Sequence, residues 1–287
     1  MPSLKAIRKR ITSVRSTRQI TKAMKMVAAA KLRRAQTAIE QARPYAKKLA
    51  EGIGDIAARV PVEDHPLLAR REPLRKVQLF VLTSDRGLCG GFNSNVNRAA
   101  ERFIVENRAK YEEISLAVVG RKAVEYFRRR RYDIKHEFRG VFADLSIGRV
   151  REIADQVIAG YTASDLDAVY MVYNEFKNAV SQKVVVEPLL PVSPAVVGDG
   201  GVEYLYEPGK RELLDLLLPR YVEIEIMRAL LESVASEHGA RMTAMDSATK
   251  NASEMIGSLT LQFNRARQAA ITKELMEIIG GAEALKG

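Results

Sequence analysis

The chain has 287 residues, a net charge of +11 and 28% charged residues, a composition typical of a soluble folded protein rather than a disordered one. No uncharged apolar stretch approaches the roughly 20 residues that cross a bilayer, and the Lys- and Arg-rich amino terminus has no apolar signal core behind it, so we expect a cytoplasmic chain. A single cysteine, Cys89, excludes an internal disulfide, and the three histidines lack metal-ligand spacing, so we expect neither a metal nor a cofactor.

Residues 1–60 are expected to form one long amphipathic helix. Apolar residues recur there at alternating spacings of three and four, which is the seam of a left-handed coiled coil. A helix of this length needs a partner, and Pro44 is expected to bend or loosen it. The seam residues are Leu4, Ile7, Ile11, Val14, Ala28, Leu32, Ala35, Ile39, Ala42, Ala46 and Leu49.

The positive charge is concentrated on this first helix. Residues 1–50 hold 14 Lys or Arg and one acidic residue, for a net charge of +13, whereas residues 51–209 and 210–287 each carry −1. Such a basic stripe predicts an acidic partner, which nucleic acid, anionic lipid or a protein surface could supply; a merely solvated face is the alternative.

Residues 75–195 are expected to form a Rossmann-like α/β domain. Strand-like runs at 77–83, 114–119, 168–173 and 183–189 alternate with helical patterns at 93–108, 121–130 and 147–161. This alternation predicts a mainly parallel sheet with right-handed crossovers.

A glycine-rich loop, SDRGLCGG at 84–91, follows the first of these strands, where backbone amides can hold a phosphate. Its spacing matches neither GxGxxG nor GxxxxGK[ST], so a structural turn is favoured over a nucleotide site. Cys89 has no histidine near it in sequence, which favours a packed thiol over a nucleophile.

Residues 209–285 are expected to form a second long helix that folds back antiparallel on the first. Gly239 and Gly257 inside it would each destabilise a helix by up to about 1 kcal/mol, and the close approach of another backbone would offset this. Its seam residues are Ile224, Met227, Leu231, Val234, Met245, Ala248, Ala252, Met255, Leu259, Ala266 and Ala269.

The hairpin also predicts a register, in which Thr21 lies near Ala244 and Arg18 near Ser247, with Asp246 close to both. Residues beyond about 265 then have no partner on the first helix, although they remain apolar. A surface outside this chain is therefore expected to enclose the tip.

Three stretches together resemble the gamma subunit of F-type ATP synthases, in that subunit's order and roughly its spacing. They are ITKAMKMVAAAKL at 20–32, DRGLCGG at 85–91 and RARQAAIT at 265–272, and YLYEP at 204–208 extends the similarity. The resemblance covers essentially the whole chain and is of the bacterial type, without the paired-cysteine insertion of chloroplast members.

The resemblance implies a fold and a function. The fold is an antiparallel coiled coil of both terminal helices with the inserted α/β domain as a foot. The function is that of a central rotor shaft without an active site, one copy per complex, coupling rotation of the c ring to ATP synthesis, or the reverse, in a hexamer of alpha and beta subunits. It also implies a peripheral position at the cytoplasmic face of the bacterial plasma membrane.

The resemblance further implies partner-binding residues. Those matching positions that meet beta-subunit loops are Lys22, Met24, Lys25, Arg241, Arg267, Gln268 and Thr272, and those matching the region near epsilon and the c ring are Tyr204, Tyr206 and Glu207.

Two alternatives from other classes remain at this point. A basic coiled coil could bind nucleic acid or act as a scaffold, although residues 1–50 contain a single aromatic residue, Tyr45, so only phosphate contacts would be available. An enzyme using the glycine-rich loop is the other alternative.

Overall fold

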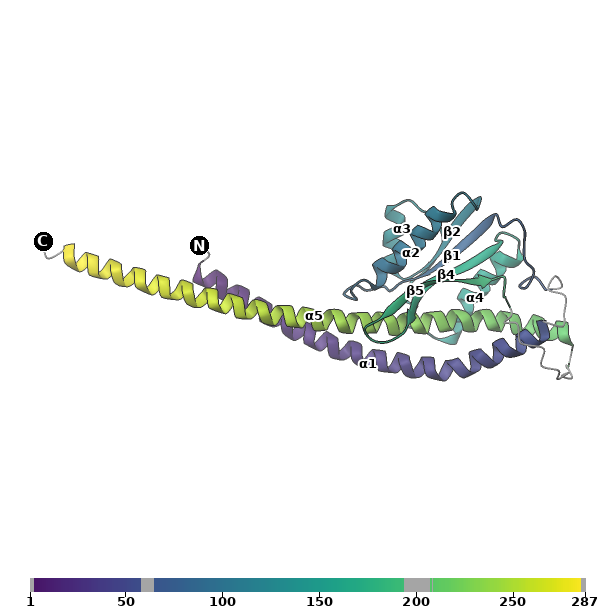
Figure 1. Cartoon of the computed structure of the whole chain (residues 1–287), viewed down its shortest axis with the longest axis horizontal. Helices are drawn as coiled ribbons and strands as arrows, with labels where there is room; N and C mark the ends of the chain where they lie inside the picture. Colours follow the sequence, from purple (N-terminus) through teal and green to yellow (C-terminus); the bar gives the residue numbers. More distant parts are fainter. Residues whose placement is uncertain (1–2, 58–64, 194–206, 208, 285–287) are drawn as a thin grey trace. The chain divides into compact units, whose positions relative to one another are not determined.

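A computed structural model describes residues 3–57, 65–193, 207 and 209–284 (Figure 1). Two long helices lie at the ends of the sequence, α1 (Leu4–Ala57, 54 residues) and α5 (Lys210–Ala284, 75 residues). The elements between them are β1 (Lys76–Leu82), α2 (Phe92–Asn107), β2 (Glu113–Val119), α3 (Arg121–Arg129), β3 (Ile134–Phe138), α4 (Ile147–Thr162), β4 (Ala168–Phe176) and β5 (Gln182–Leu190).

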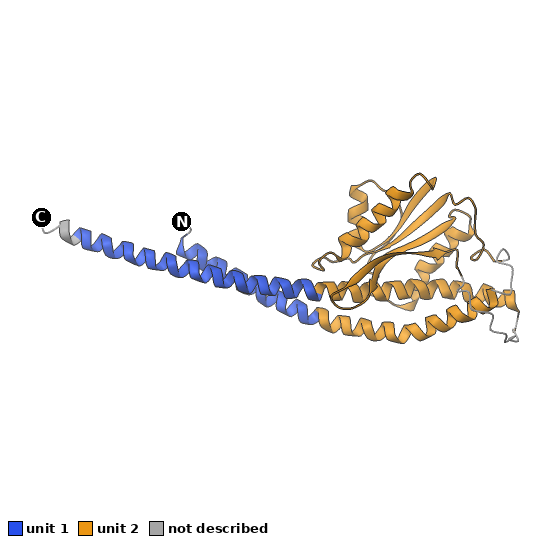
Figure 2. Cartoon of the chain, in the orientation of Figure 1, with its two compact units in different colours: residues 1–27, 242–287 blue, residues 28–241 orange. Residues whose placement is uncertain are grey.

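The chain divides into two compact units, and both long helices run through the division (Figure 2). Unit 1 contains residues 1–27 and 242–287, and unit 2 contains residues 28–241. The regular structure described in unit 1 is therefore helical, whereas unit 2 holds the sheet.

Unit 1 is an antiparallel helix pair, as the apolar seams predict. Ile7 and Ile11 near the start of α1 pack on Leu259 of α5, with Phe263 beside them. Closer to the division, the side chain of Lys25 forms an ion pair with Asp246. Early residues of α1 thus meet late residues of α5.

The predicted register is wrong. Thr21 shares a hydrogen bond of 2.8 Å with Thr249 rather than lying beside Ala244, and Asp246 pairs with Lys25 and Lys250 rather than with Arg18. A whole domain connects the two helices, so no tight turn fixes their offset, and the offset counted from the sequence was too short.

Unit 2 is built on a five-stranded sheet in the order β3-β2-β1-β4-β5. The first four strands are parallel and β5 runs antiparallel to β4. This confirms the mainly parallel sheet, and the helices and strands expected from the alternating patterns all occur within a few residues of their expected bounds.

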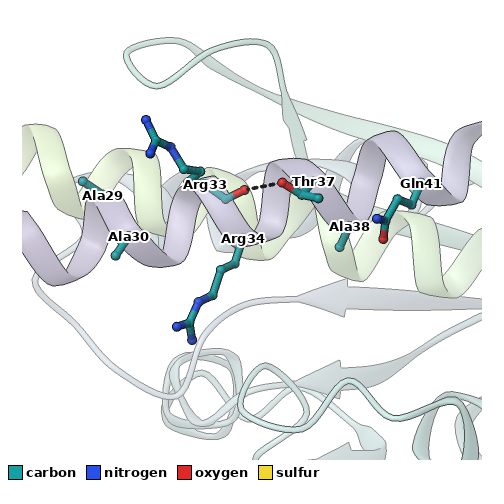
Figure 3. A pocket seen from close by; sticks show the side chains of 7 residues that line it. All are labelled: Ala29, Ala30, Arg33, Arg34, Thr37, Ala38 and Gln41. Carbon is teal, nitrogen blue, oxygen red and sulfur yellow. Dashed lines mark hydrogen bonds between the residues drawn. The ribbon is translucent and has the colours of Figure 1, made fainter.

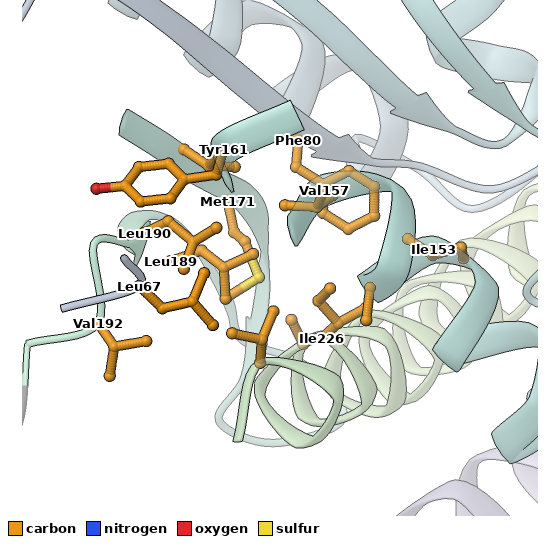
Figure 4. Packing of buried hydrophobic residues seen from close by; sticks show 14 of the residues in the cluster. Leu67, Phe80, Ile153, Val157, Tyr161, Met171, Leu189, Leu190, Val192 and Ile226 are labelled. Carbon is orange, nitrogen blue, oxygen red and sulfur yellow. The ribbon is translucent and has the colours of Figure 1, made fainter. Parts of the chain in front are cut away.

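Helices cover both faces of this sheet, with α2 and α3 on one side and α4 and α5 on the other (Figure 1). Successive residues of a strand point to opposite faces, so Phe80 and Leu82 join one core while Leu79 and Val81 join the other. The larger core also takes in α4 and α5 residues such as Ile153 and Ile226 (Figure 4). A sheet buried on both faces requires the nearly continuous apolar strands seen in the sequence.

β3 is a strand that the sequence analysis missed. Its residues alternate Ile134, Lys135, His136, Glu137, Phe138, and only Phe138 is fully buried. It lies at the edge of the sheet, where charged side chains block pairing with another chain. The short length and high charge therefore hid it.

Helix α1 continues without a break through Pro44, so the proline does not divide the helix. The expected close approach occurs at Gly239, where a Cβ would lie 3.1 Å from the carbonyl oxygen of Ala179 in the β4–β5 turn. At Gly257 a Cβ would meet nothing within 4 Å, so that glycine has no such explanation.

Candidate functional site

The basic stripe of α1 lies mostly in solvent. In unit 1 the exposed cations include Arg8, Arg15 and Lys22, and in unit 2 they include Arg33 and Arg34. Only a few of the described cations of α1 form ion pairs. Among them, Lys25 pairs with Asp246 of α5 at 2.6 Å and Lys48 pairs with Glu51 of α1 itself at 2.8 Å. Most of the stripe is thus open to an acidic partner.

Figure 3 shows one part of this stripe in unit 2, a depression of about 760 Å³ along α1. Three alanines line it, and Arg33 and Arg34 project to opposite sides of the helix in this view. Thr37 donates its hydroxyl hydrogen to the carbonyl oxygen of Arg33 at 3.1 Å, so it stays close to its own helix. The lining residues are Ala29, Ala30, Arg33, Arg34, Thr37, Ala38 and Gln41.

Unit 1 contains most of the residues assigned to beta contacts, in two groups. Lys22 is exposed, Met24 is half-buried, and Lys25 holds α1 to α5 through Asp246. The second group, Arg267, Gln268 and Thr272, is exposed on α5, roughly 30 Å from the level of Asp246 at 1.5 Å per residue. The structure therefore does not bring the two groups together into one site.

A polar cross-link joins the two helices of unit 1 at the first group. The hydrogen bonds that Asp246 accepts from Lys25 and Lys250 hold the pKa of its carboxyl below the usual value. Together with the bond between Thr21 and Thr249, these contacts form a polar rung across an otherwise apolar seam. Polar seam residues of this kind specify register.

Arg241 is not a surface residue in this chain. Its side chain is 11% exposed and pairs with Glu237 at 2.6 Å, while a second donor reaches the carbonyl oxygen of Gly87 at 3.2 Å. A third contact, at 3.2 Å, joins it to Nδ1 of His238. Arg241 therefore ties the glycine-rich loop to α5 within unit 2.

Side chains of the protein itself hold the glycine-rich loop and the amino terminus of α3. The carboxylate of Asp85 accepts hydrogen bonds from the backbone N–H groups of Arg121, at the amino terminus of α3, and of Gly140. An anion already occupies that helix end, where a ligand anion would otherwise be favoured. Asn93 accepts a hydrogen bond from the backbone N–H of Ser84, which closes the loop from inside.

Cys89 is 2% exposed, and burial raises the pKa of its thiol. The amide of Asn93 lies 3.2 Å from its sulfur. These contacts describe a packed thiol rather than an activated nucleophile. Within the described ranges, no group of three or more His, Cys, Asp or Glu side chains is arranged to hold a metal ion.

Asp85 and Asn93 were missed as organising residues. The partners of Asp85 lie on α3 and after β3, far along the chain, whereas Asn93 bonds to the adjacent loop through Ser84, Arg86 and Cys89. A second missed group surrounds Arg228 of α5, which contacts Glu187, Glu225 and Glu232 at 3.0, 2.8 and 3.5 Å. The ion pairs of Arg228 with Glu225 and Glu232 could have been predicted from their spacing, since residues three and four apart share a helix face.

The carboxyl-terminal part of α5 exposes large apolar side chains. Ile271 is 53% exposed, Leu275 54%, Met276 62% and Ile278 71%. This apolar tip follows Phe263 and Ala266, which pack against the cluster that includes Ile7 and Ile11 of α1. None of the helices in the described part of the chain combines the length and apolarity needed to span a bilayer.

Of the residues assigned to the region near epsilon and the c ring, Glu207 is exposed. Tyr204 and Tyr206 lie outside the described residues. No contact among the three is therefore described.

Comparison with known proteins covers the whole chain. The sequence model of the ATP synthase family matches residues 3–285. The ATP synthase gamma chain of Anaeromyxobacter sp. (strain Fw109-5) is 58% identical, and that of Geobacter sp. (strain M21) is 55% identical, each over the full length of both chains.

Solved structures agree with this. A chain in the central stalk and c-ring structure of the Tetrahymena thermophila mitochondrial ATP synthase is 28% identical, with a TM-score of 0.61, over 80% of this chain and 99% of that one. A Euglena gracilis mitochondrial ATP synthase chain has a TM-score of 0.67 at 21% identity, over 98% and 94%, and supports the fold alone. The chain belongs to the ATP synthase family, among the gamma chains.

Proposed function

We propose that this chain is the central rotor shaft of an F-type ATP synthase. It couples rotation of the c ring, driven by ion flow, to conformational cycling of the alpha and beta subunits, and it runs in reverse when ATP hydrolysis drives ion pumping. The observation that carries the proposal is full-length membership of the gamma chains in a molecule with two long paired helices and a bare apolar tip. The chain itself is a non-catalytic subunit.

The exposed apolar side chains of the tip support the proposal that other subunits enclose the end of α5. Contiguous exposed apolar surface of this kind marks an interaction site, because water contact with it is unfavourable. Alpha and beta subunits are the partners assigned to it. Smooth apolar contact allows a shaft to turn, whereas polar contacts from Arg267, Gln268 and Thr272 hold preferred angles.

The basic stripe supports contact with acidic loops of beta through Lys22, Met24 and Lys25. The shaft must be asymmetric, because in each orientation it has to favour different conformations in three otherwise equivalent catalytic subunits. The stripe runs along α1 only, so the shaft presents different faces as it turns. Arg241 is also assigned to the contact with beta, although its side chain is largely buried against Glu237 and Gly87.

In this proposal the two terminal segments and the α/β domain have different roles. Residues 1–60 and 209–285 form the shaft, and residues 75–195 form the foot. Epsilon and the c ring are the partners assigned to the foot, with Tyr204, Tyr206 and Glu207 at the contact. We propose a peripheral position at the cytoplasmic face of a bacterial plasma membrane, where the complex holds the chain.

The test is to tag the chain in its own cells, purify it gently and weigh the intact assembly by native mass spectrometry. One copy bound to three each of two larger nucleotide-carrying subunits is expected. A variant truncated after residue 265 should retain the α/β fold by circular dichroism and lose much of this assembly. A bare chain, or a complex with nucleic acid, would contradict the rotor proposal.

A further inference from the structure

A cavity of about 530 Å³ lies within unit 2, between α1, α4 and α5. It is separate from the basic depression of Figure 3, which is lined by α1 alone. Three helices contribute to its wall, which makes it a concave site rather than a flat helix face. Its apolar lining comes from Ile39, Ala42, Ala46, Ile224, Met227 and Leu231.

The size and lining of this cavity suit a small ligand. Binding pockets for small molecules have volumes of roughly 300 to 1,000 Å³, with mainly apolar walls and a few polar groups that fix orientation. Small alanines at positions 42 and 46 of α1 leave the space open opposite the larger side chains of α5. Tyr45 and Ile147, both more than half exposed, stand beside the opening.

Cations dominate the charged groups that line the cavity. Arg151 and Arg220 share one carboxylate, that of Glu223, at 3.5 and 2.9 Å. Arg43 adds a third exposed guanidinium from α1. The remaining lining cation, Arg228, is matched by its own acidic neighbours. Four arginines but a single glutamate, Glu223, line the cavity, so the lining itself carries an excess of positive charge, and Glu232, a partner of Arg228 outside the lining, also attracts Arg43.

We infer that this cavity binds an anionic amphiphile, a molecule with one apolar chain or ring system and a carboxylate, sulfate or phosphate head. The apolar body fills the space between α1 and α5, and the head meets Arg43 and the Arg151–Arg220 pair. Guanidinium groups recognise such oxyanions through paired N–H donors. Of the described helices, none lines the cavity over more than twelve residues, roughly 17 Å at 1.5 Å per residue, which favours this occupant over a partner helix in a long groove.

The probe for this inference is decanoate, used below its micelle concentration with the full-length chain and measured by titration calorimetry. Decanoate is expected to bind at one site per chain and at least tenfold more tightly than decanol, which has the same chain without the charge. Equal affinity for the two compounds would overturn the assignment of an anionic head.

Two pairs of variants locate the binding. Ala42→Trp fills the cavity and should weaken decanoate binding at least tenfold, whereas Thr37→Trp, exposed on the same helix outside the cavity, should leave it unchanged. Arg43→Gln should weaken binding several-fold, while Arg33→Gln should not. Arg43 is exposed, so its replacement preserves the fold if Ala42→Trp fails to fold.

Other occupants give distinct results. Affinity unchanged by both Ala42→Trp and Arg43→Gln would place decanoate elsewhere and overturn the inference. Sedimentation showing a dimer that Ala42→Trp dissociates would assign the cavity to a second copy of the chain instead. The inference does not depend on the rotor role, because it is tested on the chain alone.

Discussion

Gly120, directly after β2, has a backbone that only glycine fits. Its φ is +86°, and a Cβ there would lie 2.2 Å from the carbonyl oxygen of Thr83. We expect Gly120→Ala to destabilise the chain by roughly 3 kcal/mol or more, because backbone must move to admit the methyl group. Urea unfolding followed by circular dichroism measures the change.

Gly140 is the matched control, with φ of +74° but nothing within 4 Å of the place that a methyl group would take. Gly140→Ala should therefore lower the free energy of unfolding by only about 1 to 2 kcal/mol, the cost of holding an alanine at positive φ. Equal losses for the two variants would show that the contact with Thr83 is unimportant.

His238 gives unit 2 a pH-dependent stability. Burial, and then the charges of Arg241 and Lys31, lower its pKa to about 4, and its Nδ1 faces a donor of Arg241. The folded chain keeps this imidazole neutral while the unfolded chain binds a proton below about pH 6.5. Protons therefore favour the unfolded state, and the free energy of unfolding should fall as pH drops from about 6.5 to about 4.

The expected loss is up to roughly 3 kcal/mol, at about 1.4 kcal/mol per pKa unit. Urea midpoints of the wild type and of His238→Gln, measured from pH 7 to pH 4, isolate this contribution, because the buried His65 stays in both proteins. A stability difference that is constant with pH would contradict it.

At the residue scale, the role of a side chain could not be predicted from the sequence where its hydrogen-bond or ion-pair partners lie far away along the chain. The turn at the glycine-rich loop and the packed state of Cys89 could be predicted from local pattern. The role of Asp85 could not, since its two donors lie 36 and 55 residues away. The burial of Arg241 likewise could not be predicted, because it depends on the contact with the carbonyl oxygen of the remote Gly87 as well as on the ion pair with Glu237.

At the scale of elements, Gly239 and Gly257 of α5 provide a paired test. Gly257→Ala should raise the free energy of unfolding by roughly 0.5 to 1 kcal/mol, because alanine is the better helix former and the added methyl meets open space. Gly239→Ala should give no gain or a loss, because its methyl group would press on the backbone of Ala179.

Thermal and urea unfolding of both variants measure this difference. A similar gain at both positions would mean that the β4–β5 turn yields easily and that Gly239 has no packing role. The comparison needs no other control, since the same substitution is made twice in one helix.

Elements with strong periodicity could be predicted from the sequence, and those fixed by the tertiary fold could not. The start of α5 at Lys210 and the strands β1, β2, β4 and β5 follow from apolar patterns in the sequence. β3 was hidden because an edge strand carries charge. The register between α1 and α5 was misjudged because seams of small residues specify offset weakly, and the contact of Thr21 with Thr249 decides it.

At the scale of the whole molecule, the prediction concerns the tip of α5. Arg267→Ala combined with Gln268→Ala should lower ATPase turnover of the assembled complex several-fold. Both side chains are exposed, so the stability of the isolated chain should change by less than about 0.5 kcal/mol. Turnover assays of the purified complex and unfolding of the chain measure the two effects.

Glu254→Ala is the control, because Glu254 is exposed on the same helix but lies closer to the division between the units. It should leave turnover unchanged. Normal turnover and assembly in the double variant would remove Arg267 and Gln268 from the proposed contact with beta.

The polar rung of Thr21, Thr249, Lys25 and Asp246 has a mechanical consequence. Apolar seams rich in alanine allow two helices to slide past each other by a turn with little change in packing. Hydrogen bonds at one level forbid that slide, since a shift would separate every donor from its acceptor. The helix pair of unit 1 can then twist under load while its length stays fixed, as a drive shaft must.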